Sequence, residues 1–427
     1  MRREVYYLLI LFFIAGTQFS RSQTLNSPDT IRLTLAEIEA LFLKNNFSLL
    51  AARYQVDEAD AAIIQSNLYP NPTLNIDQGA FNPQTKKWFD FTHTGESAAS
   101  LQQVIMLGGK RNKQFSIAES NSKISKYQFY DLIRTLRYEL RSSFYKLNYL
   151  EETIKVYDQE IQSLKTLVNG YTKQYENGNI SLLEITRLKA LLFSLSNERA
   201  DLIREIDENQ NNIQILTGDT LIRIVTPLPD TTYLKKITTY IPDYRRLLDS
   251  AMMNRFDLLV GRETVVLNQK NLAFQKSLRV PDITVGANYD RQGSYVNNYN
   301  SISMSIDLPL WNRNQGNIKI ASFKIDESKE NESLVEIKIK TEINMAKRKL
   351  IEAQTLYNSE ENKFSSDYDK LSDEMIKAYK NHLISLLEFI DYCETTKNLT
   401  IERNRLNVDL IEAAENINKA TGTDIIK

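Results

Sequence analysis

Apolar residues recur at every seventh position along two stretches of the chain, and this period predicts long helices that pack on partner helices. The first stretch carries the row Ile133, Leu140, Leu147, Ile154, Ile161, Val168 and Tyr175. The second carries Ile343, Leu350, Tyr357, Phe364 and Leu371. An ordinary buried helix would not keep this spacing over so many turns. Because Gly and Asn at 177–179 are typical of a helix end, we expect a long helical hairpin in each half.

Alternation of apolar and small polar residues predicts β-strands at about 282–290 and 301–308. The apolar face of these segments consists of Ile283, Val285, Ala287, Tyr289, Ile302, Met304, Ile306 and Leu308. The alternation fits transmembrane strands, and it fits equally the half-buried strands of a soluble sheet. A less regular pair is expected at about 73–80 and 97–105, with a polar loop between the two strands.

The chain repeats itself, which predicts two similar halves. Residues between Asn45 and Pro72 recur 209 positions later, and the stretch 175–184 recurs 204 positions later. The expected organisation is a first repeat over 23–220 with its hairpin tip at about 177–183, an equatorial linker over 221–243, and a second repeat over 244–427 with its tip at about 381–387.

Residues 1–22 have the features of a secretory signal peptide. Arg2 and Arg3 precede an apolar run over 5–15, and small and polar residues follow. This run is shorter than the roughly 20 residues that a membrane-spanning helix needs; the alternative is an N-terminal core helix. A lipid anchor on an N-terminal cysteine is not expected, because the only cysteine is Cys393.

Composition narrows the chemistry. The chain has 53 Lys and Arg against 54 Asp and Glu, a balance that does not favour nucleic-acid binding. Two His and one Cys are too few for a metal centre of imidazoles and thiolates. No nucleophile–base constellation stands out, so an exported hydrolase is not favoured. We expect no catalytic residues, no cofactor and no resident metal.

Four strands per chain are too few to close a sheet on itself. An open strand edge cannot face lipid, because its backbone groups would lack hydrogen-bond partners. Small closed barrels need about eight strands, and an open lumen needs more. Two copies would supply eight strands and three would supply twelve. A homotrimer is therefore the smallest assembly expected to leave a lumen, with six helical hairpins side by side.

An export signal, a twofold repeat, and a strand pair with a long hairpin in each half together resemble the TolC family of outer-membrane efflux channels. The segments 102–111, with Gly108 and Gly109, and 308–316, with Pro309 and Gly316, are similar to the strand–helix junctions of its heavy-metal (CzcC-like and CusC-like) branch. The resemblance implies a mainly α fold with a small β part. It implies four transmembrane strands per chain, in a shared 12-strand barrel and an α-helical tunnel completed by a homotrimer.

The resemblance also implies a location in the outer membrane of a Gram-negative bacterium, with a long helical extension into the periplasm. Such channels passively conduct substrate that an inner-membrane pump of the RND type delivers through a periplasmic adaptor. The branch indicates heavy-metal cations; a drug-efflux or type I secretion duct is the alternative. A soluble secreted coiled-coil scaffold is the less favoured interpretation.

By the same resemblance, the hairpin tips contact the adaptor and acidic residues narrow the periplasmic entrance. The tip residues are Gly178, Asn179, Ile180, Ser181 and Leu182 in the first half and His382, Leu383, Ile384, Ser385 and Leu386 in the second. The matching constriction residues are Glu388 and Asp391, with Tyr379 nearby. A spacing of three puts both carboxylates on one helix face, where a ring of them would favour cations. The alternative is a pair of solvated surface acids.

Overall fold

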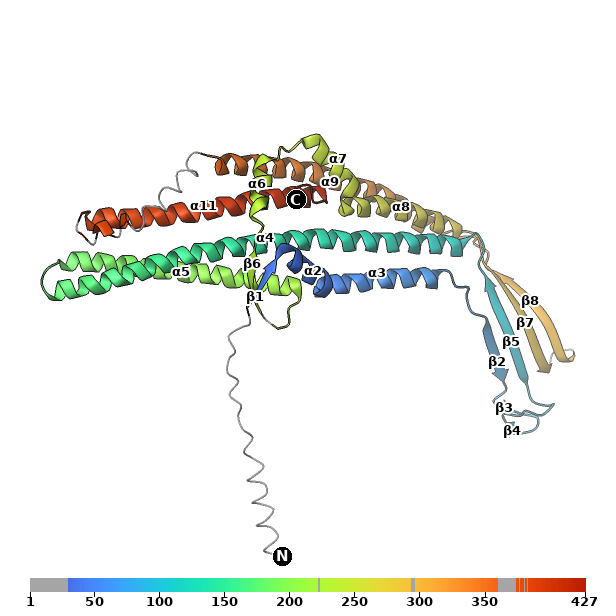
Figure 1. Cartoon of the computed structure of the whole chain (residues 1–427). Coiled ribbons are helices and arrows are strands. Elements are labelled where there is room, and N and C mark those ends of the chain that lie inside the picture. The colour runs from blue at the N-terminus through green and yellow to red at the C-terminus, as the bar shows by residue number, and fades with distance from the viewer. Residues whose placement is uncertain are drawn as a thin grey trace, which may run out of the picture.

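The computed structural model describes residues 30–221, 223–292, 296–359, 374–375, 377–379, 381 and 383–427. The expected signal peptide and the tip residue His382 lie outside these ranges. The described part is elongated, with helical hairpins at one end, a four-stranded sheet at the other and short elements between them (Figure 1). The expected mainly α fold with a small β part is confirmed.

Four helices give the described part most of its length. Their bounds are α4 Lys110–Glu176, α5 Leu182–Thr217, α9 Gln315–Tyr357 and α11 Leu386–Thr421. With 67 residues, α4 spans about 100 Å at 1.5 Å per residue, and it reaches from the sheet to the first hairpin tip (Figure 1). Within the described ranges, no helix is both long enough and apolar enough to cross a membrane.

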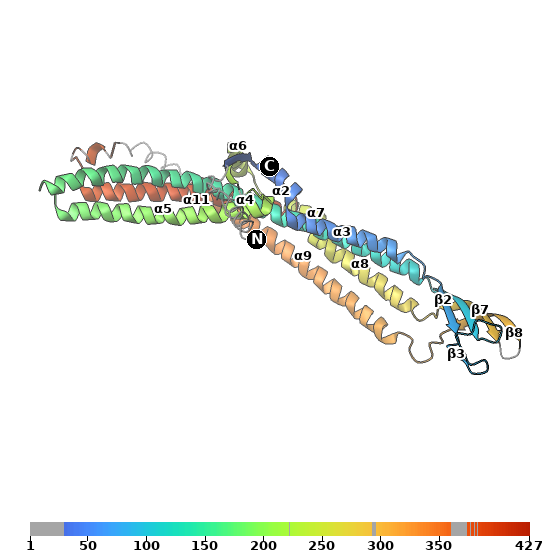
Figure 2. The same cartoon turned by 90° about the horizontal axis from the view of Figure 1, so that it is seen from below.

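Shorter elements build the middle of the molecule and the helical layer next to the sheet. They are α2 Leu35–Asn45, α3 Phe47–Ser66, α6 Thr231–Thr239, α7 Tyr244–Asn254, α8 Phe256–Ser277 and the parallel strands β1 Thr30–Thr34 and β6 Ile224–Leu228. Between the middle and the sheet, neighbouring helices pack in the order α3–α4–α8–α9 (Figure 2). Helices α3 and α9 are therefore the edges of this layer.

The sheet joins the two halves of the chain. Its strands are β2 Thr73–Gln78, β5 Ser97–Ile105, β7 Ile283–Gln292 and β8 Asn297–Ile306, antiparallel and in the order β2-β5-β7-β8. The central pair β5–β7 connects the halves, and β2 and β8 are the edges. A separate small hairpin of β3 Phe81–Asn82 and β4 Lys87–Trp88 lies in the loop after β2.

The strand register puts the apolar residues on one face of the sheet. Leu74 lies opposite Leu101, Leu101 opposite Ala287, and Ala287 opposite Ile302. The next row on the other face is Asn75, Ser100, Asn288 and Ser301, in which Asn75 and Asn288 each donate a hydrogen bond to a serine hydroxyl. The predicted alternation is thus realised in all four strands.

Two apolar cores hold the helices together. One lies in the middle of the molecule, where α2, α4, α7, α9 and α11 meet, and contains Phe42, Leu140, Phe144 and Leu350. The other lies along the hairpins and contains Leu164, Leu188, Leu195 and Phe389. Leu140, Leu164 and Leu188 come from the seven-residue rows, which shows that the period marks the packed faces of the long helices.

The internal repeat reappears as two similar joints. Between α2 and α3, the Asn46 amide donates to the Leu216 carbonyl at 2.8 Å. At the corresponding place between α7 and α8, Arg255 donates to the Ala420 carbonyl at 3.1 Å. In both halves, a residue at a kink between two helices thus holds the end of the helix that returns from the hairpin tip.

A glycine makes each joint close. Gly218 and Gly422 end α5 and α11 with φ of +61° and +75°. A Cβ on Gly218 would lie 2.5 Å from the Asn45 carbonyl oxygen, and one on Gly422 would lie 2.9 Å from the Asn254 oxygen. Only glycine allows both this backbone conformation and this approach.

Candidate functional site

The hairpin tips lie at the end of the molecule opposite the sheet (Figure 1). In the first half, α4 ends at Glu176 and Gly178 turns the chain with φ of +76°. The Asn179 amide donates to Gln174 at 3.0 Å, and the Ser181 hydroxyl caps α5 by accepting from the Glu184 N–H. This turn is closed by its own hydrogen bonds, which gives the first tip a defined shape.

Leucine side chains project from both tips. Leu182, Leu183, Leu383 and Leu387 are all exposed, each by 60% or more, whereas Ile180, Ile384 and Leu386 pack against the hairpin core. Among the predicted tip residues, Leu182 and Leu383 are thus available for contact with another protein. Exposed leucines at the ends of helical hairpins are typical of docking surfaces.

The predicted constriction residues occupy two different environments. Glu388 and Asp391 are exposed on α11, three residues apart and therefore on neighbouring positions of one face. Tyr379 is only 3% exposed and is stacked between Tyr171 and Phe389, with ring centroids 5.4 and 4.6 Å away. The structure therefore brings the two carboxylates together and places the tyrosine in the layer beneath them.

Glu388 also caps the helix on which it lies. Its Oε2 accepts a hydrogen bond from the Ser385 N–H at 2.7 Å, and the Ser385 hydroxyl accepts from the Glu388 N–H at 3.3 Å. The backbone N–H of Ser385, followed by its hydroxyl, holds the pKa of Glu388 below its usual value. This reciprocal pair is a capping box. The Ser-x-x-Glu spacing at 385–388 is visible in the sequence and could have revealed this role.

A partly buried ion pair joins the two hairpins above the tips. Lys397 of α11 donates to Glu198 of α5 at 2.7 Å, and the Tyr157 hydroxyl of α4 donates to the same carboxylate oxygen at 2.9 Å. Beside them, burial raises the pKa of Glu160 to about 7, although Lys397 opposes the shift. Sequence reasoning missed this cluster, because its members come from three helices that are distant along the chain.

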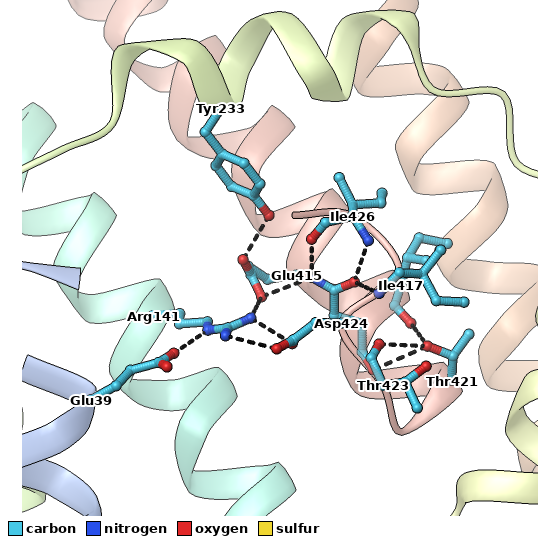
Figure 3. A network of polar contacts seen from close by, with 11 residues as sticks. Glu39, Arg141, Tyr233, Glu415, Ile417, Thr421, Thr423, Asp424 and Ile426 are labelled. Carbon is cyan, nitrogen blue, oxygen red and sulfur yellow. Dashed lines mark hydrogen bonds and ion pairs between the residues drawn. The ribbon is translucent and has the colours of Figure 1, made fainter. Parts of the chain in front are cut away.

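The middle of the molecule holds a larger charged network centred on Arg141 (Figure 3). Arg141 on α4 contacts Glu39 of α2 at 2.5 Å, Glu415 of α11 at 3.0 Å and Asp424 of the C-terminal segment at 2.8 Å. The Tyr233 hydroxyl of α6 donates to Glu415 at 2.7 Å. Burial, and then the negative charge of Glu415, raises the pKa of Tyr233, so the phenol stays protonated and remains a donor. This network too was missed at the level of the sequence.

The two strand–helix junctions differ. Gly108 and Gly109 both have positive φ, and Gly109 is the residue immediately before α4. At the second junction the left-handed residue is Asn314, with φ of +59°; Pro309 lies in the preceding loop and Gly316 lies inside α9. Asparagine tolerates this conformation better than most residues, so an asparagine takes the place that a glycine occupies in the first half.

No metal centre is apparent in the part of the chain that the structure describes: its His, Cys, Asp and Glu side chains form no group of three or more that could hold an ion. The carboxylates of Glu388 and Asp391 are exposed to solvent rather than enclosed. Their arrangement can attract cations electrostatically, and it provides no cage for holding one.

Comparisons with known proteins agree with this architecture. Residues 40–219 match the family model for outer membrane efflux proteins. The chain is 23% identical over 328 residues to the cobalt-zinc-cadmium resistance protein CzcC of Cupriavidus metallidurans, covering 76% of this chain and 75% of the relative.

Solved structures show the same fold. A structure of CusC matches with a TM-score of 0.71 at 16% identity, covering 91% of this chain and 92% of CusC. The outer membrane channel MtrE of Neisseria gonorrhoeae, in its open state, matches with a TM-score of 0.71 at 15% identity, covering 92% of this chain and 89% of MtrE. The CmeC outer membrane channel of Campylobacter jejuni matches with a TM-score of 0.70 at 14% identity, covering 91% and 86%. The expected TolC-like fold is confirmed.

Proposed function

We propose that this chain, which has the TolC-like fold and resembles the heavy-metal branch of the TolC family, is the outer-membrane channel of a tripartite efflux system. It passively conducts substrate to the exterior from an inner-membrane pump and a periplasmic adaptor. The sheet lies in the outer membrane of a Gram-negative bacterium, and the helical hairpins extend into the periplasm.

One observation carries this proposal: the apolar face of the sheet has no cover within the chain. Ile302 is 86% exposed and Ile76 is 72% exposed, and Met304 and Leu74 are also exposed. In a soluble half-buried sheet, this face would pack on a core. A continuous apolar face opposite a face of Asn and Ser fits lipid on one side and water on the other, which favours a channel over a soluble scaffold.

The open edges support a homotrimer. Strands β2 and β8 each have one neighbour in the chain, so each leaves a row of backbone groups unpaired. Pairing β8 of one copy with β2 of the next satisfies both rows. Three copies close a barrel of twelve strands, which is wide enough for a lumen. The helices that continue from the strands then line a tunnel.

The exposed tips and carboxylates fit the two tasks expected at the periplasmic end. Leu182 and Leu383, with the neighbouring leucines, offer apolar contact to the adaptor. Glu388 and Asp391 from three copies place six carboxylates at the entrance, where they raise the local concentration of cations. Tyr379 supports this layer from beneath through its stacking on Phe389.

The substrate class follows from the curated relative. CzcC is named for resistance to cobalt, zinc and cadmium, and we propose divalent heavy-metal cations as the cargo here. Selection of the cargo then depends on the pump, because the described residues offer electrostatic attraction and no metal cage.

Deletion of the gene in its host tests the proposal. We expect the deletion strain to tolerate less zinc, cobalt or cadmium, with tolerance restored by the full-length gene, and the protein to remain in the outer-membrane fraction after carbonate extraction. Unchanged metal tolerance with reduced drug tolerance or lost polypeptide secretion would assign a different cargo. Recovery of the protein as a water-soluble monomer would contradict the channel itself.

A further inference from the structure

The two repeats place a phenylalanine at the same point of each joint. Phe47 is the first residue of α3 and Phe256 the first residue of α8, and they are related by the repeat offset of 209. Both follow the kink residue that holds the returning helix of its own half. The local structure around the two rings is therefore similar, and any difference in their surroundings comes from the neighbouring helix.

That neighbour is present for Phe256 and absent for Phe47. The Phe256 ring stacks on Tyr130 of α4, with centroids 4.9 Å apart and planes at 26°. The Phe47 ring is 64% exposed, and it lines an open cleft of about 360 Å³ together with Leu41, Leu50 and Leu221. The first joint thus lacks the helix that covers the second one.

Both edge helices of the layer expose apolar stripes. On α9 the stripe recurs every eleven residues, a period of three helical turns; its members are Phe323, Leu334, Met345 and Leu356, which are 46–61% exposed, and Ile337 lies beside them. On α3 the exposed apolar residues are Phe47, Leu50, Tyr54 and Ile64. Polar residues are the norm on the solvent side of a helix, so both stripes require a partner.

Distances from the sheet match the two stripes to each other. Phe256 lies 21 residues before the end of α8, and its partner Tyr130 lies 20 residues after the start of α4. Phe47 lies 19 residues before the end of α3. At 1.5 Å per residue, the corresponding level on α9 falls at Leu334–Ile337, where Leu334 and Ile337 are exposed.

We propose that α9 of one copy packs on α3 of the next, with Phe47 seated against Leu334 and Ile337 of the neighbouring chain. The contact inside the chain between α4 and α8 is the template for this contact between chains. This inference rests on the homotrimer of the proposed function and adds the residues that close its helical wall. Because both partners are copies of one chain, the contact is head-to-tail and closes as a ring.

Disulfide trapping tests the contact. In a full-length Cys393→Ser background, Phe47→Cys with Ile337→Cys is expected to give dimers and trimers linked between chains after mild oxidation of membranes. Tyr130→Cys with Phe256→Cys is the positive control and links within one chain. Gln55→Cys with Ile337→Cys is the matched negative control, because Gln55 is exposed on α3 but lies off the apolar stripe.

The mass of the detergent-solubilised protein separates the two proposals. A trimer that is linked at 47 and 337, and not at 55 and 337, supports the contact. A trimer with no link at 47 and 337, in which the 130–256 pair still forms, overturns the contact and leaves the channel standing. A monomer in membranes and in detergent overturns both. Phe47→Ala adds a test without cysteine: it is expected to lower the temperature at which the trimer dissociates in detergent, whereas Gln55→Ala leaves that temperature unchanged.

Discussion

Glu388 combines two tasks that belong to different levels of the molecule. Its Oε2 closes the capping box at the start of α11, and its negative charge lies at the proposed entrance. Removing the side chain would remove both at once. Glutamine separates the tasks, because its amide oxygen can still accept from the Ser385 N–H while the charge is gone.

We expect Glu388→Gln with Asp391→Asn to lower the preference for cations in planar-bilayer recordings while the thermal stability at neutral pH stays close to that of the wild type. Glu388→Ala with Asp391→Asn should lower both. Equal cation preference in all three proteins would contradict the entrance role and leave the cap intact.

The same residue gives a pH dependence with a defined sign. The pKa of Glu388 is lower in the folded protein than in the unfolded chain, so its contribution to stability is present at neutral pH. This contribution is lost as the pH falls from the unfolded value through the lowered folded value. In the glutamine variant this part of the acid dependence should be absent, since glutamine does not titrate.

At the scale of single residues, local spacing was informative and long-range partnership was not. The Ser-x-x-Glu cap at 385–388 can be recognised from four residues, because its hydrogen bonds stay within one helical turn. The partners of Arg141 are 102 to 283 residues away along the chain. No local pattern distinguishes this arginine from the many others on helical surfaces.

At the scale of elements, the strands are defined by which face meets which solvent. Ile302 and Ser301 are adjacent on β8 and lie on opposite faces of the sheet, as the register with Ala287 and Asn288 shows. A charge on one face would therefore lie in lipid, and a charge on the other would lie in the water-filled lumen.

We expect Ile302→Lys to cost about 2–4 kcal/mol of membrane-inserted stability, the range for a lysine near the bilayer midplane, and to reduce the amount of protein assembled in the outer membrane. Ser301→Lys is the matched control, with the same new side chain one residue away, and should assemble normally. Heat-modifiable mobility on gels measures assembly. Equal losses in both variants would contradict the assignment of the two faces.

The sequence predicted these elements because their periods are intrinsic to the backbone. A period of two follows from the pleat of a strand, and a period of seven follows from helices that supercoil. The joints at Asn46 and Arg255 were not predicted, although the repeat marked both positions. Each joint depends on a carbonyl some 165 to 170 residues away, and spacing along the chain does not show which distant carbonyl a side chain reaches.

At the scale of the whole molecule, the network around Arg141 ties the long rod together at its middle. Arg141 joins α4 to α2, α11 and the C-terminal segment, and Tyr233 adds α6 through Glu415 (Figure 3). The two halves of the chain contribute carboxylates to one guanidinium. Several buried charges therefore depend on a single cation.

We expect Arg141→Met to cost about 3–5 kcal/mol of unfolding free energy, since it leaves buried carboxylates without their counter-charge. Arg199→Met should cost only about 0–1 kcal/mol, because the Arg199–Asp158 pair is partly exposed to solvent. Denaturant unfolding monitored by circular dichroism compares the two variants. The loss should be concentrated at the middle of the molecule, where hydrogen exchange of α2 and the end of α11 should quicken while that of the hairpin tips does not.

Compensation distinguishes the lost charge balance from lost packing. Adding Glu415→Gln to Arg141→Met removes one of the stranded charges and keeps an acceptor for the Tyr233 hydroxyl. If electrostatics dominates, the double variant should regain part of the stability that Arg141→Met loses, as is found when a buried ion pair is replaced as a unit. A double variant that is less stable than Arg141→Met would show instead that Glu415 stabilises the middle of the molecule mainly through Tyr233 and Asn418, its other hydrogen-bond partners.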